Sequence, residues 1–457
     1  MVIRTRDMTE GKPANLIITF ALPLMLGNVF QQAYTLVDAI VVGRVAGVEA
    51  LAALGASDWL NWMLLGLVVG FTHGFTILVS QHFGAKDLGA LRNTVAMSII
   101  LSAGIAIIMT ILGLLFARPM LDMMNTPNNI IDDAYIYLTI LFSGIPIVTA
   151  YNITSSILRA MGDSKTPLWA MIIASVINII LDLIFVAGFH WGVAGAAIAT
   201  VISQLFSFLY CLKTIWNIPF LNMENKDWKL DKQVIKSLLK LGTPMAFQNT
   251  VIGAGGIVVQ YIINGFGFIF VAAFTATNKL YGLLELAASS FGYAVATFTG
   301  QNLGARKYQR IRDGVNSGIK MSIATACTIS VVMISMGRNI LKLFISGTPE
   351  EVSAVIDIAY RYLFVMAAML FILYLLHLYR SALQGMGDTV IPMISGIAEL
   401  IMRVSVIIFL PLLIGETGIY FAEVAAWLGA AIILMGAYYF RINKLQDTKF
   451  KLMSKTY

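Results

Sequence analysis

The chain has 457 residues, of which 58% are hydrophobic and only 12% are charged, and its formal net charge is +7. Because soluble domains carry about 25% charged residues, this composition excludes an ordinary soluble protein. Apolar runs of roughly 20 residues recur along the whole length, and each is long enough to cross a bilayer. Cys211 and Cys327 both lie within apolar runs, so no disulfide framework is implied.

Apolar segments follow one another from the N-terminus to the C-terminus. Only helices are compatible with them, because the polar groups of an open sheet edge cannot be satisfied in hydrocarbon. Pro23, Pro146 and Pro244 lie within these segments and are expected to bend them, with a gating role for Pro23 and Pro244. The polar residues 1–13 lead directly into a long first segment, so we expect no removable signal peptide. We predict twelve transmembrane helices, near residues 14–43, 50–80, 93–117, 130–156, 167–188, 193–216, 234–264, 269–299, 313–336, 354–379, 390–414 and 418–440.

Three short patterns occur twice, in the same order and at an almost constant offset. Pro23 with Asn28 recurs as Pro244 with Asn249, Gln81-His-Phe-Gly-Ala-Lys86 recurs as Gln301-Asn-Leu-Gly-Ala-Arg306, and Met161-Gly-Asp163 recurs as Met386-Gly-Asp388. This indicates a duplicated unit of six helices. Because six is even, both copies enter the membrane in the same direction, and their pseudo-two-fold axis runs along the membrane normal.

The predicted fold is therefore an all-α integral membrane protein with two six-helix bundles. We place the N-lobe at residues 1–216, a cytoplasmic linker at 217–233 and the C-lobe, with its basic tail, at 234–457. With both termini in the cytoplasm, most of the 31 basic residues also lie there, in agreement with the positive-inside rule. This distribution explains the net positive charge without nucleic-acid binding. We expect a multi-pass protein of the plasma (inner) membrane.

The repeated patterns resemble those of the multidrug and toxic compound extrusion (MATE) family of secondary transporters, over essentially the whole chain. The resemblance implies alternating access between two lobes, with export of amphipathic, often cationic organic compounds driven by Na⁺ or H⁺ influx. It implies a transporter and not an enzyme, with no cofactor apart from the transported ion. We expect a monomer in the lipid bilayer, because one chain supplies both lobes.

Polar residues in the first half form a candidate cation site. Asp38, Asp182 and Thr200 lie at one depth, about 8–10 Å below the predicted outer surface. Asn178 lies one helical turn before Asp182. The repeat equivalents of Asp38, Asp182 and Thr200 are Val259, Ile407 and Ala426, so the duplicated architecture does not require the acids.

Two chemical interpretations of this oxygen-rich set are open. An all-oxygen site suits a hard cation, whereas two close carboxylates also suit a shared proton. A network of hydrogen bonds that only ties helices together is the structural alternative. One branch of the MATE family carries an Asp in span one, Asn-x-x-x-Asp in span five and a Thr in span six as its cation site. Asp38, Asn178, Asp182 and Thr200 match that pattern.

The second half contains ionisable residues at other positions. Glu399 and Arg403 are i,i+4 neighbours, which favours a structural ion pair. Glu285 is expected either to form a substrate or proton site or to make a salt bridge to another helix, because Lys279 faces elsewhere. The four histidines lie on separate segments, so no metal site beyond Na⁺ is predicted. Aromatic candidates for the substrate cavity are Tyr34, Tyr281, Tyr293 and Tyr374.

Two other functions compete with drug export. A flippase for lipid-linked saccharides, or for another lipid handled by the same superfamily, would share the duplicated architecture, but such flippases tend to place basic residues in the cavity. A membrane enzyme or structural subunit would need a catalytic cluster or a large soluble face, and neither is visible. No Gly-x4-Gly-Lys-Ser/Thr loop occurs, so an ion gradient is the expected energy source.

Overall fold

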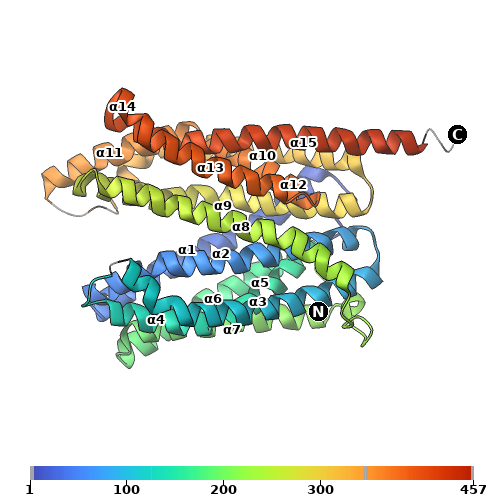
Figure 1. Ribbon diagram of the computed structural model, residues 1–457, viewed down its shortest axis with the longest axis horizontal. Coiled ribbons are helices and arrows are strands. Elements are labelled where there is room, and N and C mark those ends of the chain that lie inside the picture. Colours follow the sequence, from blue (N-terminus) through green and yellow to red (C-terminus); the bar gives the residue numbers. More distant parts are fainter. Residues whose placement is uncertain (1–4, 125, 344, 346–347, 454–457) are drawn as a thin grey trace. The chain divides into compact units, whose positions relative to one another are not determined.

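The computed structural model describes residues 5–453, except 125, 344, 346 and 347. The described part is helical and contains no strand, which confirms the all-α prediction (Figure 1). The ends of the two predicted lobes, residues 1–4 and 454–457, lie outside the described residues.

The chain forms two compact units. The first contains residues 22–250 and the segment that ends at Met8, and the second contains Thr9–Ala21 and the chain from Val251 onward. Two helices belong to both units in part, α1 (Pro13–Val45) and α8 (Lys232–Asn264). The predicted division at residues 217–233 differs from these limits, and the cytoplasmic position of that segment stays a prediction.

The remaining helices each belong to one unit. The first unit contains α2 (Val48–Gly84), α3 (Leu88–Met123), α4 (Ile131–Ser143), α5 (Ile145–Ala160), α6 (Lys165–Asp182), the π-helix η1 (Leu183–Gly188), α7 (Gly192–Trp216) and the 3₁₀-helix η2 (Pro219–Leu221). The second contains α9 (Phe268–Gly304), α10 (Tyr308–Leu341), α11 (Pro349–Ala368), α12 (Leu370–Gly385), α13 (Val390–Phe409), α14 (Pro411–Ile414), the 3₁₀-helix η3 (Gly415–Phe421) and α15 (Ala422–Met453).

Each of the twelve predicted spans coincides with a helix or with consecutive helices. By length and apolarity alone, eight helical segments in the described chain are able to cross a membrane, or ten if each bent pair is one span. Helix α9 is not among these eight segments. The chain from Val390 to Asp447, which contains several consecutive helices, counts as a single segment. Twelve membrane crossings and a two-bundle arrangement therefore stay predictions.

The duplicated patterns form matching turns in the two halves. Gly47 and Gly267 have φ of 97° and 92° and precede α2 and α9, and Gly162 and Gly387 have φ of 84° and 82°. Glycine adopts this left-handed backbone without a steric cost. In the first half, the Asp163 Oδ1 accepts hydrogen bonds from the main-chain amides of Lys165 (3.0 Å) and Thr166 (2.9 Å). The Gly-Asp pattern therefore forms a turn in which glycine supplies the left-handed backbone and Asp163 accepts main-chain hydrogen bonds.

In the Gly-Ala loops that follow α2 and α9, glycine is not the residue with positive φ. The left-handed residues are Lys86 (φ 59°) and Arg306 (φ 56°), two positions after each glycine. The Lys86 amide donates to the Phe83 carbonyl at 3.1 Å, and the Arg306 amide donates to the Leu303 carbonyl at 2.9 Å. These bonds cap the final carbonyls of α2 and α9, so helix capping sets the conformation at the basic residue.

Two helix breaks also recur. Helices α4 and α5 meet at 47°, and α11 and α12 meet at 51°. Pro146 is the second residue of α5, so the bend expected there is confirmed. The second break is at Met369 and has no proline, which is why the sequence did not reveal it.

Helix α2 makes a close crossing with the part of α8 that belongs to the first unit. A Cβ atom added at Gly70 would overlap the Ala246 backbone, and one added at Gly74 would overlap the Gly242 backbone. Both helices thus present small residues four positions apart, the pattern that lets helix backbones approach closely in membranes. The Asn249 side chain donates to the Gly66 carbonyl at 2.9 Å, one turn beyond.

We expect Gly74→Val to destabilise the protein by about 1–3 kcal/mol or more. The atoms that the new side chain would overlap belong to the backbone of α8, which cannot move aside as a flexible side chain could. Thermal unfolding of the purified protein in detergent measures the effect. Gly104→Val on α3 is the matched control, since a Cβ there meets nothing within 4 Å. Equal melting temperatures for the two variants would contradict the close crossing.

Candidate cation site and ionic cluster

The acids predicted for the first unit are buried. Asp38 on α1 is 7% exposed, and Asn178 and Asp182 on α6 are both 0% exposed. Neither carboxylate forms an ion pair within the described chain. An ionisable side chain inside a membrane protein is costly unless function retains it, so these side chains are the primary site candidates.

Several of their polar atoms have no hydrogen-bond partner in the described chain. Burying a polar group in this way costs about 1–3 kcal/mol, and here such atoms gather on neighbouring helices. They are Asp38 Oδ1, Asn178 Oδ1 and Nδ2, Asp182 Oδ1 and Oδ2, and Gln204 Oε1.

Hydrogen bonds between helices position these groups. The Ser175 hydroxyl of α6 donates to the Phe30 carbonyl of α1 at 3.4 Å, and the Ser207 hydroxyl of α7 donates to the Ala170 carbonyl of α6 at 2.9 Å. Helix α6 thus contacts both α1 and α7. The charges of Asp38 and Asp182 lie close enough to interact.

Asp182 occupies a transition in helix geometry. It is the last residue of α6, and the π-helix η1 follows at Leu183. π-helical turns are rare and occur frequently at functional sites, because the wider turn changes the direction of the side chains next to it. The local backbone therefore supports a specialised role for Asp182.

Three residues that the sequence analysis missed join this region. Gln204 lies one turn after the half-buried Thr200 on α7, and its Oε1 is buried without a partner. Asp58 on α2 and Tyr137 on α4 both interact electrostatically with Asp38. The i,i+4 rule that linked Asn178 to Asp182 would also have found Gln204.

The resulting set consists mainly of oxygen ligands. Carboxylate, amide and hydroxyl oxygens suit a hard cation, and the two carboxylates also suit a proton. Among the residues that the structure describes, no group of three or more His, Cys, Asp or Glu side chains is arranged to hold a metal ion. The amide and hydroxyl oxygens would therefore have to complete the coordination of a cation such as Na⁺.

In the second unit, the predicted ion pair has different partners. Arg380 of α12 pairs with Glu399 of α13, and Arg403 of α13 pairs with Glu423 of α15 at 2.8 Å. The expected Glu399–Arg403 pair is therefore wrong. Glu399 and Arg403 thus each pair with a residue on a neighbouring helix. Opposite charges attract more strongly when they are buried between helices than when they lie along the exposed surface of one helix.

Glu285 also has a partner on another helix. Its Oε1 lies 3.3 Å from the Nε2 of His377 on α12. Lys279, which lies earlier on α9, is exposed. Of the two interpretations left open for Glu285, the contact between helices is present, and a substrate or proton role stays a prediction.

The four tyrosine candidates have different environments. Tyr34 is half-buried one turn before Asp38. Tyr281 stacks on Trp427 with ring centroids 5.8 Å apart, and Tyr374 is fully buried with its hydroxyl 3.1 Å from the Leu284 carbonyl. Tyr293 is half-buried further along α9. Tyr374 is thus part of the core, whereas Tyr34 and Tyr281 accompany the acids.

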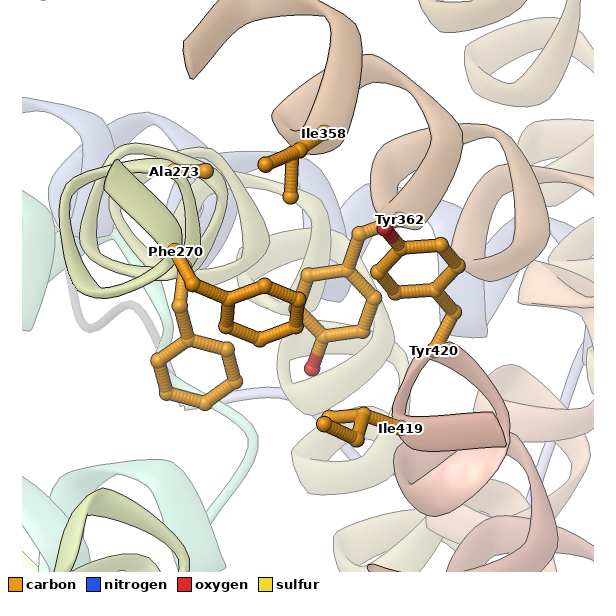
Figure 2. Close-up of a pocket in the computed structure, with 7 residues that line it drawn as sticks. Phe270, Ala273, Ile358, Tyr362, Ile419 and Tyr420 are labelled. Carbon is orange, nitrogen blue, oxygen red and sulfur yellow. The ribbon is translucent and has the colours of Figure 1, made fainter. Parts of the chain in front are cut away.

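An aromatic pocket lies elsewhere in the second unit (Figure 2). Its rings stack in sequence, with centroid distances of 6.2 Å for Phe270–Tyr420, 5.9 Å for Tyr420–Tyr362 and 5.5 Å for Tyr362–Phe274. The residues that line it in the described chain are aromatic or aliphatic, and none is charged. None of the four candidate tyrosines contributes to it, so we assign the pocket to packing.

The MatE family model matches this chain twice, over residues 23–184 and 244–409. The matches begin at Pro23 and Pro244, the first residues of the repeated pattern. This confirms that the sequence is duplicated.

Similar proteins carry names of multidrug transporters. The probable multidrug resistance protein YpnP of Bacillus subtilis is 30% identical over 354 residues, which cover 77% of this chain and 78% of YpnP. The multidrug export protein MepA of Staphylococcus aureus is 24% identical over 435 residues, which cover 94% of each chain.

Solved structures share the fold. A MOP superfamily transporter from Pyrococcus furiosus aligns with a TM-score of 0.90 at 23% identity and covers 96% of this chain and 98% of its own. An outward-facing multidrug resistance MATE transporter aligns with a TM-score of 0.89 at 22% identity. That alignment covers 98% of this chain and 100% of the transporter.

Proposed function

Since this chain belongs to the MatE family of membrane transporters, we propose that it is a cation-coupled multidrug efflux antiporter. It exports amphipathic, often cationic organic compounds by alternating access, and the influx of Na⁺ or H⁺ drives the export. The names of YpnP and MepA support drug export as the substrate class. It acts as a monomer in the plasma membrane, with both termini in the cytoplasm.

The observation that carries the coupling mechanism is the group of unpaired polar atoms in the first unit. Asp38, Asn178 and Asp182 bury polar atoms that bind nothing in the described chain. A cation or proton held between the two carboxylates would offset both the desolvation and the mutual repulsion of these groups. Thr200 and Gln204 of α7 would supply the remaining oxygen ligands.

Ion binding drives transport only if the ion prefers one conformation of the protein. A ligand shifts a conformational equilibrium by the difference between its affinities for the two states. Asp38 and Asp182 lie on different helices, so a relative movement of α1 and α6 would change the cation affinity. The bend expected at Pro23 provides such a movement, because α1 passes from the second unit to the first at Leu22.

The flippase alternative is less well supported by the second unit. Binding an anionic lipid-linked saccharide calls for guanidinium or ammonium groups without internal partners. Arg380 and Arg403 are instead each paired with a carboxylate.

Transport by purified protein in liposomes tests the proposal. Ethidium movement is followed under an imposed Na⁺ gradient and, separately, under an imposed pH gradient. We expect one of the two gradients to drive ethidium against its own concentration gradient. Movement of a fluorescent lipid-linked saccharide without any ion gradient, and no ethidium transport, would favour the flippase.

The topology is tested by cysteine labelling in a background without Cys211 and Cys327. Lys229 in the predicted linker is exposed, as is Lys342 after α10. We expect Lys229→Cys to react with a membrane-impermeant maleimide only after the cells are opened, and Lys342→Cys to react in intact cells. The reverse pattern would place the termini outside.

A further inference from the structure

The linker of residues 217–233 is held against the first unit by hydrogen bonds to α3. Asp227 is 4% exposed, and its carboxylate accepts from the Arg92 side chain at 3.1 Å and from the Glu224 main-chain amide at 2.9 Å. The Asn93 side chain donates to the Asp227 carbonyl at 3.2 Å. The linker therefore has a defined inner face, which is fixed to the bundle.

The apolar side chains of this region point in two directions. Ile218 and Leu221 are 3% and 5% exposed and belong to a core cluster with residues of α2, α3, α5, α6 and α7. Three larger side chains are exposed instead. Trp228 and Leu230 are 42% and 70% exposed, and Trp216, the last residue of α7, is 78% exposed. The linker thus presents aromatic and aliphatic surface outward, although its inner face is already filled.

Lysines accompany these exposed side chains. The stretch 213–240 contains six lysines against three acidic residues. The acidic groups have partners within the chain, because Asp227 pairs with Arg92 and Glu224 pairs with Lys226 at 2.7 Å, and the Asp231 Oδ1 accepts from the Gln233 amide at 2.8 Å. Four exposed lysines form no ion pair in the described chain, and these are Lys213, Lys229, Lys232 and Lys236.

The first turns of α8 separate the lysines from the apolar side chains. Lys232, Lys236 and Lys240 follow one another at intervals of four residues, which places them on one face of the helix. Val234 and Leu238 lie on the opposite face, where they pack in a cluster with residues of α2 and α3. The lysine face is therefore turned away from the core of the first unit.

The linker lies beside the membrane, because it joins two helices that are each able to cross one. Both α7 and α8 are long and apolar enough to do so. Tryptophan is enriched at the boundary between membrane and water, and clusters of four or more lysines next to a membrane-spanning helix attract anionic lipid headgroups. The outward side chains of this region combine both features.

We propose that the linker and the first turns of α8 form a docking surface for anionic phospholipids of the bilayer. The ammonium groups of Lys229, Lys232 and Lys236 contact the lipid phosphates, and Trp228 and Leu230 enter the boundary between headgroups and acyl chains. An acidic protein segment would match the charge, but a lipid also matches the exposed apolar side chains and is always present beside α7 and α8. The surface is independent of the coupling site and of the transported substrate.

Quenching of Trp228 fluorescence by brominated lipids tests the proposal. The other five exposed tryptophans are replaced by phenylalanine, so that Trp228 and the buried Trp427 remain, and Trp228→Phe in the same background gives the signal of Trp427 alone. The full-length protein is reconstituted into liposomes with equal amounts of phosphatidylglycerol and phosphatidylcholine in both leaflets, and only one of the two lipids carries bromine.

We expect brominated phosphatidylglycerol to quench Trp228 about twice as strongly as brominated phosphatidylcholine. The difference should shrink when the salt concentration is raised from about 0.1 M to about 1 M, because the screening length falls from about 10 Å to about 3 Å. Both leaflets have the same composition, so the result does not depend on the orientation of the protein in the liposome.

Lysine substitutions locate the charge that selects the lipid. The linker variant Lys229→Gln/Lys232→Gln/Lys236→Gln is expected to be quenched equally by the two brominated lipids. A control variant loses the same number of charges from exposed lysines elsewhere and is expected to keep the preference for phosphatidylglycerol. The control carries the substitutions Lys12→Gln, Lys279→Gln and Lys342→Gln.

Protein that keeps all seven tryptophans provides a second measurement, in case the phenylalanine background does not fold. After mild detergent extraction from mixed bilayers, mass spectrometry gives the ratio of the two lipids that stay bound. The wild type and the control variant should retain an excess of phosphatidylglycerol, and the linker variant should not.

Three results would overturn the proposal. The first is equal quenching of Trp228, or equal retention, of the two lipids with the wild-type lysines. The second is the same loss of preference in the linker and control variants, which would mean that total charge and not this surface selects the lipid. The third is no quenching of Trp228 by either lipid, which would assign the surface to a different partner, such as an acidic protein segment.

Discussion

Replacing either buried acid of the first unit by asparagine, as Asp38→Asn or Asp182→Asn, is expected to abolish coupled drug efflux. Each change removes a charge that the coupling cation would neutralise, so the ion gradient no longer favours one conformation. Substrate affinity should change much less, because the substrate site need not share these ligands. Folding should be preserved, since an amide of equal size replaces a carboxylate that has no ion-pair partner in the described chain.

Ethidium efflux from cells, normalised to the amount of protein in the membrane, measures this effect. Asp122→Asn is the matched control, because its side chain is 60% exposed and makes only a 3.9 Å contact with Arg118. Surface pairs of this kind contribute about 0–1 kcal/mol. If both buried-acid variants export ethidium at the rate of Asp122→Asn, the site of the first unit is structural.

The largest loss of stability is expected from breaking a buried ion pair of the second unit on one side only. Arg403→Gln leaves Glu423 buried without its partner, and this kind of change costs about 3–5 kcal/mol. The double variant Arg403→Gln/Glu423→Gln removes both charges and should lose much less. Unfolding temperatures in detergent provide the comparison.

A second double variant tests which residues are partners. Glu399→Gln/Arg403→Gln, which would be mild if these neighbours paired along α13, leaves Arg380 and Glu423 each without its partner. We expect it to be at least as unstable as Arg403→Gln alone. If it is instead the more stable of the two double variants, the pairing between helices is wrong.

The features that were predicted best from the sequence are those that occur in both halves of the chain. Two copies of the same patterns indicated a duplication, and the helices, the Gly162 and Gly387 turns and the double family match agree with it. Glycine, proline and apolar runs act locally, so one copy of each signal is enough to locate a turn or a helix. The break at Met369 was missed because it has no such local signal.

Contacts between helices were harder to predict. The i,i+4 rule gives neighbours on one helix. Arg403 instead pairs with a glutamate on α15, and Glu399 pairs with an arginine on α12. Such partners depend on how helices are rotated and packed, which the spacing along one segment does not specify. The first-unit acids were identifiable because a buried charge stands out in an apolar segment, whereas the neutral Gln204 could be found only from its i,i+4 spacing from Thr200.

Direct measurement of cation binding tests the central claim that Asp38 and Asp182 hold the coupling ion. Purified protein is titrated with radioactive sodium and, separately, with acid in weak buffer, and the Asp38→Asn and Asp182→Asn variants are titrated in parallel. We predict that this protein binds one Na⁺ or one extra H⁺ per chain, and that adding Asp38→Asn or Asp182→Asn removes that binding. Equal cation binding with and without these substitutions would contradict the account.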